Sequence, residues 1–179
     1  MCMCRFARIN AAIATSPVSP EPIIWPNGIS TRWNERVLEG RPAPVETIFV
    51  GGGTPTRLTT AQLERLTAMV GRWFPLVSGG EWTVEANPGT LDRDKVEALA
   101  RGGVNRVSLG AQSFQRASLA MLERVHDPSE VARGVELIAP RFDRWSLDLI
   151  FGVPGSTLND WKADLAAALA LGPGHLSCY

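Results

Sequence analysis

The feature that most constrains the fold of this chain is a regular alternation between short apolar runs and longer segments of helical periodicity. Apolar runs typical of buried strands lie at residues 48–50, 82–86, 104–109, 145–151 and 175–179. Between them, apolar residues recur at helical spacing over 59–74, 92–101, 119–138 and 158–171, with Thr59 and Asp92 as helix-starting residues. Because strands that alternate with helices form βα units, the sequence predicts an α/β fold with a parallel sheet.

Most of the predicted strands are followed by glycine or polar residues at their C-terminal ends. In chain order these ends carry Gly51 to Thr54, then Glu85 and Asn87, then Gln112, then Asp148 just ahead of Gly152. In a barrel-like α/β fold the active site is assembled from such strand ends. We therefore expect a barrel with its site there, while an open doubly wound sheet, the alternative, would also place its ligand at strand ends.

The most distinctive strand end is ETIFVGGGTPT, residues 46–56. A glycine triplet directly after a buried strand removes side chains where the backbone turns sharply or lies against a ligand. A plain strand-to-helix turn, the alternative interpretation, needs one or two glycines rather than three. We interpret this segment as a binding loop.

The first 44 residues lack this regularity. They contain Pro17, Pro20, Pro22 and Pro26, and no clear periodicity precedes Ser30. We predict an irregular arm over residues 1–44, with at best a short helix near 31–38, and one barrel core over residues 45–179.

Composition excludes several classes of function. Eighteen basic residues balance eighteen acidic ones, so no electrostatic argument favours nucleic acid or an anionic membrane surface as a partner. No apolar run has the length of a membrane span, and the first residues lack the order of a signal peptide. The three cysteines, Cys2, Cys4 and Cys178, are an odd number at the two extremes of the chain, which argues against a disulfide framework. We expect a cytoplasmic protein.

Five motifs within residues 45–179 resemble those of one family. They are GGGTPT at 51–56, VEANPGT at 84–90, GVNRVSLGAQSF at 103–114, LERVHD at 122–127 and SLDLIFGVPGST at 146–157. In this order and spacing they are similar to motifs of the radical S-adenosylmethionine proteins related to oxygen-independent coproporphyrinogen III oxidase, including the heme-chaperone branch. The resemblance implies a partial (βα)6 TIM-like barrel with parallel strands, here truncated at both ends.

The resemblance also implies cofactors. In such proteins three cysteines of a CxxxCxxC loop hold a [4Fe–4S] cluster, whose unique iron binds the methionine end of S-adenosylmethionine. The substrate class is a porphyrin or heme, and heme itself is a possible ligand. The positions that match the family's cofactor-binding residues are Gly52, Gly53, Thr54, Glu85, Gln112, Arg124 and Asp148. Of these, the first three would line the S-adenosylmethionine sites, Glu85 would accept from ribose hydroxyls, and the last three would line the adjacent cofactor site.

Purely structural roles are the alternatives for these polar residues. Glu85 would then pair with an arginine such as Arg106, Gln112 would cap a loop, and Arg124 would be a solvated helix charge. Asp148 is the hardest to explain structurally, because an unpartnered charge inside an apolar strand is costly. His126 and His175 are taken as structural.

The cysteines depart from the family's pattern. Cys2 and Cys4 have the wrong spacing, and Cys178 lies at the far end of the chain. Because a [4Fe–4S] cluster requires thiolate ligands, we expect no cluster at the family's site in this chain.

The genetic code offers a reason for this departure. If each residue of 1–16 takes any of its codons, reading from Met3 two nucleotides later permits VPFCAHQCGYCDF, which contains CxxxCxxC. Continued over 17–35, the shifted frame permits AGVAGTDHLAERYLDALE, a typical amphipathic helix. We hypothesise that residues from about 3 to 40 are an out-of-frame translation of the cluster loop and first βα unit, with the frame restored before Val45. The Asp-Phe after the last shifted cysteine favours the heme-chaperone branch.

The sequence therefore predicts a radical S-adenosylmethionine protein of the coproporphyrinogen oxidase or heme-chaperone type. Two alternatives stay open. One is an inactive truncated remnant that lacks the cluster loop, and the other is an unrelated α/β barrel that binds phosphate at the glycine loop.

Overall fold

The computed structural model of this chain describes residues 6–10 and 44–179, with side chains from residue 44 onward. Its strands form one sheet in the order β1-β2-β3-β4-β5-β6, and every neighbouring pair is parallel. They are β1 (Phe6–Asn10), β2 (Val45–Gly51), β3 (Leu76–Ala86), β4 (Arg106–Gln112), β5 (Arg144–Leu149) and β6 (His175–Cys178). The predicted parallel α/β fold is confirmed. Because the strand order never reverses, the sheet lacks the switch point of a doubly wound fold.

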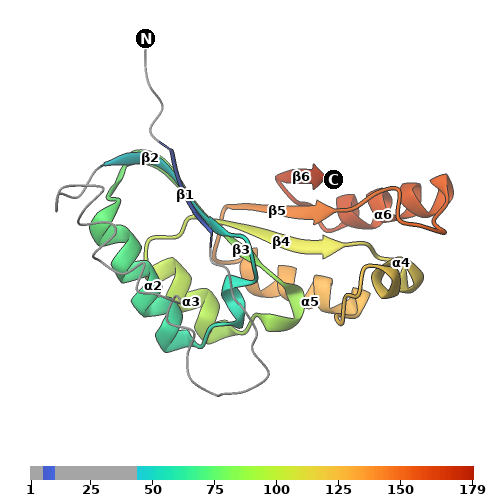
Figure 1. Cartoon of the computed structure of the whole chain (residues 1–179), viewed down its shortest axis with the longest axis horizontal. Coiled ribbons are helices and arrows are strands. Elements are labelled where there is room, and N and C mark those ends of the chain that lie inside the picture. The colour runs from blue at the N-terminus through green and yellow to red at the C-terminus, as the bar shows by residue number, and fades with distance from the viewer. Residues whose placement is uncertain (1–5, 11–43) are drawn as a thin grey trace, which may run out of the picture.

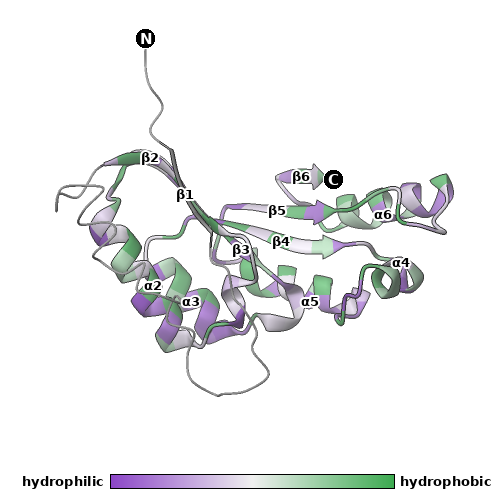
Figure 2. Cartoon of the chain, in the orientation of Figure 1, coloured by the Kyte–Doolittle hydropathy of each residue, from purple (hydrophilic) through white to green (hydrophobic). Residues whose placement is uncertain are grey.

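Helices connect the strands and cover one side of the sheet. The α-helices are α2 (Thr60–Trp73), α3 (Arg93–Arg101), α4 (Arg116–Met121), α5 (Pro128–Ile138) and α6 (Leu158–Ala170), and the 3-10 turns are η1 (Pro55–Arg57) and η2 (Pro88–Thr90). Figure 1 shows α2, α3 and α5 along the same side of the sheet. Their amphipathic character is visible in Figure 2. Within the part of the chain that the structure describes, no helix is long and apolar enough to cross a membrane.

Strand β1 lies inside the segment predicted to be an irregular arm. It runs parallel to β2 with Phe6 opposite Thr47 and Asn10 opposite Gly51. An open edge of β2 would present unpaired backbone groups, and a short strand satisfies them without any regular apolar pattern for sequence reasoning to detect. The remaining arm, including the helix predicted near 31–38 and both Cys2 and Cys4, lies outside the described residues.

Helix starts follow the sequence closely. Thr59 caps α2 in a reciprocal pair with Gln62, and the Asp92 carboxylate accepts from the Lys95 amide 2.8 Å away at the start of α3. The spacing at 119–125 predicted helix beyond the observed end of α4. This helix stops at Met121, and Glu123 takes a left-handed conformation with φ 53°.

Strand β3 begins six residues earlier than the apolar run at 82–86 predicts. The register shifts between Val45 and Thr47 where these residues meet β3. A Cβ on Gly80 would lie 2.7 Å from the Glu46 carbonyl oxygen, so the glycine permits this close approach.

Alternation along the strands separates an apolar face from a polar one. Val84, Val107 and Leu147 are buried in the core with residues of the covering helices, such as Leu63, Leu99, Val131 and Ile138. The positions between them are polar, with Thr83 and Glu85 on β3, Arg106 and Ser108 on β4, and Ser146 and Asp148 on β5. The fold therefore gathers polar side chains on the sheet face opposite the helices.

Candidate functional site

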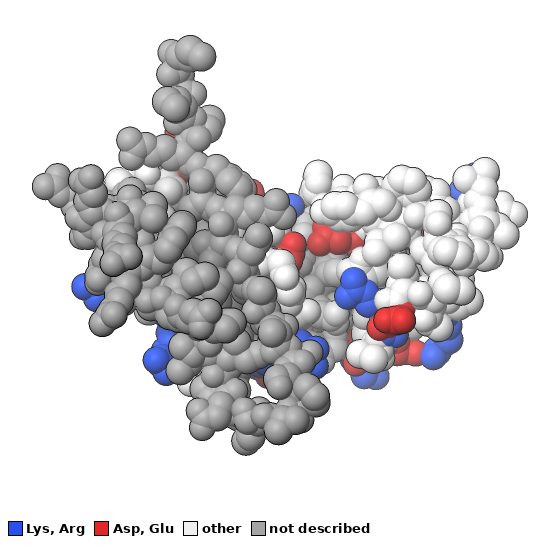
Figure 3. Space-filling model, in the orientation of Figure 1, with Lys and Arg blue, Asp and Glu red and all other residues white. Residues whose placement is uncertain are grey.

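A cavity of about 220 Å³ lies at the C-terminal ends of β2 to β5. Its lining residues are Gly53, Thr54, Glu85, Ala86, Asn87, Ser108, Gly110, Gln112, Arg124, Asp148 and Tyr179. Six of the seven predicted site residues are among them, and Gly52 precedes Gly53 in the same loop. Figure 3 shows acidic side chains in a hollow on this face with basic ones nearby. The structure thus brings the predicted positions together, and their roles in binding stay predictions.

One wall of the cavity, here called the β2–β3 flank, consists of residues 51–54 and Glu85. The Gly52 amide donates to Oε2 of Glu85 over 2.9 Å. A Cβ on Gly51 would overlap the Glu85 carboxylate and would lie 2.6 Å from Cε1 of Phe49. Only glycine at this position lets the carboxylate lie against the loop. Among the described residues Arg106 forms its ion pair with Glu81 (3.7 Å), so Glu85 is not the arginine-paired carboxylate of the structural alternative.

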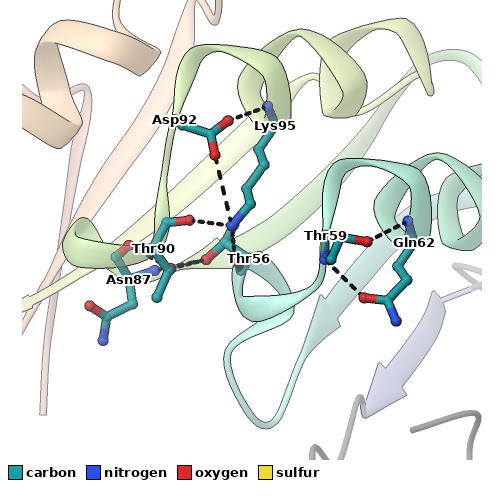
Figure 4. A network of polar contacts seen from close by, with 7 residues as sticks. All are labelled: Thr56, Thr59, Gln62, Asn87, Thr90, Asp92 and Lys95. Atoms are coloured by element: carbon teal, nitrogen blue, oxygen red, sulfur yellow. Dashed lines mark hydrogen bonds and ion pairs between the residues drawn. The ribbon is translucent and has the colours of Figure 1, made fainter. Parts of the chain in front are cut away.

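A polar network behind the β2–β3 flank ties its two loops together (Figure 4). The buried Thr56 hydroxyl lies 2.6 Å from the Thr90 hydroxyl and accepts from the Asn87 amide over 3.2 Å. The Lys95 ammonium donates to the carbonyl oxygens of Thr56 and Thr90, both over 2.9 Å. The glycine loop and the loop after β3 are therefore held together by hydrogen bonds among residues of which only Asn87 lines the cavity.

The opposite wall, the β4–β5 flank, presents Gln112 and Asp148. The Ser108 hydroxyl lies 2.9 Å from both carboxylate oxygens of Asp148 and 2.9 Å from the Ser146 hydroxyl, to which Arg106 donates over 2.9 Å. A chain of hydrogen bonds thus runs from Arg106 through Ser146 and Ser108 to Asp148. Burial raises the pKa of Asp148, and hydrogen bonds from Ser108 and Ser177 and the charge of Arg106 oppose that rise.

Gln112 and Arg124 reach the cavity from irregular backbone. Gln112 has φ 64°, a left-handed conformation uncommon for a residue other than glycine, and its carbonyl accepts from the Ile150 amide over 2.8 Å. Arg124 lies in the turn between α4 and α5 and not on a helix, and it lines the cavity while remaining exposed. It is therefore an exposed charge, as the structural alternative expects, but it does not lie on a helix.

The charges around the cavity are unbalanced. Glu85 and Asp148 contribute carboxylates, and Arg124 is the cation among the lining residues. The amide of Gly52 is already occupied by Glu85. This arrangement suits a ligand that carries positive charge and hydroxyl donors better than an anion.

Sequence reasoning missed two of the residues that support the site. Ser108 was not predicted, although polar residues at every second position of the 104–109 and 145–151 strands were a signal that this sheet face is polar. Asp164 on α6 was also missed, and this residue is 3% exposed. His126 is buried with Nε2 3.0 Å from the Ala111 carbonyl oxygen, and His175 is exposed on β6, so neither lines the cavity.

The residues present do not fit a [4Fe–4S] cluster. Cys178 is an exposed thiol on β6, and the sequence holds no CxxxCxxC. Among the described residues no group of three His, Cys, Asp or Glu side chains is placed to hold a metal ion. No chemical step is therefore assigned to a cluster in this chain.

Comparison with known proteins gives consistent results. The model of the radical SAM superfamily matches residues 31–168. The heme chaperone HemW of Escherichia coli (strain K12) is 42% identical over 136 residues, which are 75% of this chain and 36% of that protein. HemW of Synechocystis is 39% identical over 137 residues, covering 76% of this chain and 33% of that protein. The chain thus spans about a third of the length of these relatives.

Among solved structures, the coproporphyrinogen III oxidase HemN from Escherichia coli is similar with a TM-score of 0.70 and 27% identity, over 81% of this chain and 35% of that one. The radical S-adenosylmethionine methyltransferase TsrM from Kitasatospora setae, at 16% identity and a TM-score of 0.61 over 82% of this chain and 28% of that one, shares the fold.

Proposed function

This chain belongs to the radical SAM superfamily, and from that premise we propose that its cavity binds S-adenosylmethionine in a protein of the heme-chaperone type. The observation that carries the proposal is the carboxylate of Glu85, held against the glycine loop by the Gly52 amide and facing a cavity with an excess of acidic groups. S-adenosylmethionine supplies the matching chemistry, since it has ribose hydroxyls, an ammonium group and a sulfonium centre.

Each proposed site residue has a task that its chemistry allows. The second oxygen of the Glu85 carboxylate accepts from ribose hydroxyls, while Gly53 and Thr54 contact the ligand through backbone and hydroxyl. Asp148 accepts from, and pairs with, a cationic or hydroxyl group, and Gln112 donates and accepts through its amide. Arg124 at the rim binds a carboxylate. Heme or a porphyrin is the proposed further ligand of the whole protein, because the relatives named above are heme chaperones.

The phosphate-binding alternative fits the cavity less well. A phosphate at the glycine loop would need free amides, and the Gly52 amide already donates to a carboxylate. The negatively charged oxygens of a phosphate would also be repelled by the Glu85 carboxylate.

Equilibrium binding of S-adenosylmethionine to this chain tests the proposal, with isothermal titration calorimetry as the measurement. We expect binding that is weakened about tenfold or more by Glu85→Gln, because a carboxylate acceptor is lost. The matched control is Glu97→Gln, on the exposed side of α3, which should bind as the unmodified chain does. We also expect weaker binding of S-adenosylhomocysteine, which lacks the sulfonium charge. Thermal stabilisation by inorganic phosphate with no response to S-adenosylmethionine would overturn the proposal in favour of the alternative.

Catalytic competence is a separate matter, and the cysteine spacing favours a second candidate, an inactive remnant that keeps the cofactor cavity. Anaerobic iron–sulfur reconstitution followed by ultraviolet–visible and electron paramagnetic resonance spectra distinguishes the two. Failure to form a cluster would support the inactive remnant. A cluster whose reduced signal changes with S-adenosylmethionine would contradict it.

We also propose that residues from about 3 to 40 are an out-of-frame translation of the family's cluster loop and first βα unit, from a frameshifted gene or an error in the nucleotide sequence. The support is the CxxxCxxC that the shifted frame permits at the expected place. The coding DNA tests this directly. Codons that forbid those cysteines in the shifted frame would rule it out, and codons that encode them would make repair of the frame the next step.

A further inference from the structure

A buried carboxylate on α6 has no part in the cavity described above. Asp164 is 3% exposed, and among the described residues it forms no salt bridge. Burying a charge without a cation is costly unless hydrogen-bond donors surround it. The donors that surround Asp164 therefore indicate what the residue is for.

All of these donors belong to the loop that follows β4. The Ser113 hydroxyl donates to Oδ2 of Asp164 over 2.6 Å, and the Phe114 amide donates to Oδ1 over 2.8 Å. The side-chain amide of Gln115 adds a longer contact of 3.3 Å to Oδ1. One carboxylate from about 50 residues further along the chain thus binds three consecutive loop residues.

The residue immediately before this trio is Gln112, whose backbone is left-handed with φ 64°. Such a conformation costs about 1–3 kcal/mol for a residue other than glycine, and it persists only where its surroundings fix it. The turn at Gln112 sends its side chain into the cavity, while Ser113 is buried against Asp164. On the strand side, the Ile150 amide donates to the Gln112 carbonyl.

We propose that Asp164 is a positioning residue, which holds the loop after β4 so that Gln112 keeps its left-handed backbone and presents its amide to the ligand. The inference rests on the proposed function of the cavity. Asp164 itself touches neither the cavity nor the ligand. It acts through Ser113 and Phe114, whose hydrogen bonds fix the chain on the far side of the turn.

Two variants of nearly equal size test this proposal. Asp164→Asn replaces a charged double acceptor by a neutral group with one acceptor and one donor, so both bonds lose their charge assistance and Ser113 can bond only by accepting from the new amide. Asp160→Asn, on the exposed first turn of the same helix, is the matched control for effects on α6 itself. We expect Asp164→Asn to weaken S-adenosylmethionine binding about tenfold, the equivalent of one hydrogen bond, and Asp160→Asn to leave it unchanged.

A double-mutant cycle separates positioning from general stability. If Asp164 acts through Gln112, Asp164→Asn should have little further effect on binding once Gln112→Ala is present. An equal loss in both backgrounds would overturn the proposal. If Asp164→Asn does not fold, Ser113→Ala takes its place in the cycle, because it leaves the Phe114 amide bond while removing the donor to Asp164 and the acceptor of the Gln115 amide.

A measurement without ligand keeps this inference distinguishable from the proposed function. By nuclear magnetic resonance, Asp164→Asn should shift the side-chain amide signals of Gln112 and speed hydrogen exchange at the Phe114 amide, and Asp160→Asn should do neither. If the unmodified chain fails to bind S-adenosylmethionine, the proposed function fails and these signals still decide the role of Asp164. Unchanged Gln112 and Phe114 signals in Asp164→Asn would refute it.

Discussion

The two flanks of the cavity are held in place by different means. Behind the β2–β3 flank, residues of two neighbouring loops bind one another, and Lys95 donates to two backbone carbonyls. Behind the β4–β5 flank, support comes from side chains distant in sequence: Asp164 holds the loop after β4, and Ser108 connects Asp148 to Ser146 and Arg106. Behind the first flank the bonds thus run between hydroxyls, backbone groups and the Lys95 ammonium, which also pairs with Asp92 at 4.0 Å, whereas behind the second they end on the carboxylates of Asp148 and Asp164.

This difference has a physical consequence. The bonds behind the β2–β3 flank join the Lys95 ammonium to backbone carbonyls and the Thr56 and Thr90 hydroxyls to each other, so none of them depends on a carboxylate as acceptor. A buried carboxylate that accepts from hydroxyls binds differently once it is protonated. We therefore expect substitutions behind the first flank to act as simple losses of contacts, and the effect of replacing Asp148 to depend on pH.

The largest effect is expected from Gly51→Ala on the β2–β3 flank. The new methyl group would overlap the Glu85 carboxylate and lie 2.6 Å from Cε1 of Phe49; both are the ends of side chains, and the carboxylate can turn away. The Gly52 hydrogen bond is then lost and the carboxylate leaves its place at the ligand. We expect S-adenosylmethionine affinity, measured by calorimetry, to fall about 100-fold, with a loss of only about 1 kcal/mol in the free energy of unfolding.

Gly71→Ala is the control for this change. Its Cβ would meet Trp82 at 3.6 Å, an ordinary contact, and alanine is favoured over glycine within a helix such as α2. The control should bind as the unmodified chain and be slightly more stable. Unchanged affinity in Gly51→Ala would mean that the position of Glu85 does not govern binding.

A smaller effect, on stability, is expected from Lys95→Met behind the same flank. The substitution removes the donor to Thr56 and Thr90 while preserving an apolar stem of similar length. Hydrogen bonds from a charged group are worth about 1.5–3 kcal/mol, so urea denaturation should show a loss near 2 kcal/mol. Arg101→Met is the comparison, because its exposed pair with Glu64 should contribute less than about 1 kcal/mol. Equal losses of unfolding free energy in the two variants would show that the hydrogen bonds of Lys95 contribute no more than the exposed Arg101–Glu64 pair.

The sequence predicted the two flanks to different extents. The β2–β3 flank is built from neighbours in sequence, and its glycine loop and Glu85 were found as motifs at strand ends. Thr59 and Asp92 marked the helix starts because capping depends on side chains within three residues. Interactions between sequence neighbours of this kind can be recognised from the sequence alone.

On the β4–β5 flank, Gln112 and Asp148 were likewise predicted as polar strand ends, but the residues that support them could be recognised only in the fold. Asp164 bonds to residues about 50 positions away, and its sequence neighbours indicate its burial but not those partners. A signal was present in the helix itself, since Asp164 is flanked at helical spacing by Trp161, Leu165 and Ala168, on a face that packs inward. The early start of β3 and the strand β1 were missed for a related reason, because backbone pairing with β2 requires no apolar pattern.

The smallest effect, and the sharpest test of the difference between the flanks, concerns Asp148. Because burial raises its pKa in the folded chain above the ordinary 3.8, the folded state binds a proton more tightly than the unfolded state. Its contribution to stability is therefore full below pH 3.8 and is lost as the pH rises through the folded pKa. Asp148→Asn, which stays neutral, should accordingly be more stable than the unmodified chain at neutral pH, and this gain should disappear in acid.

Ser108→Ala should change the pKa of Asp148 in a defined direction. Removing the hydroxyl that donates to both carboxylate oxygens should raise the pKa of Asp148 further, as measured by a carbon-13 titration of its carboxyl group. Lys95→Met should leave that titration unchanged, because its contacts lie behind the other flank. A pKa of Asp148 below 3.8 in the unmodified chain would show that the hydrogen bonds and the charges of Arg106 and His175 outweigh burial, and the sign of the stability change in Asp148→Asn would then reverse.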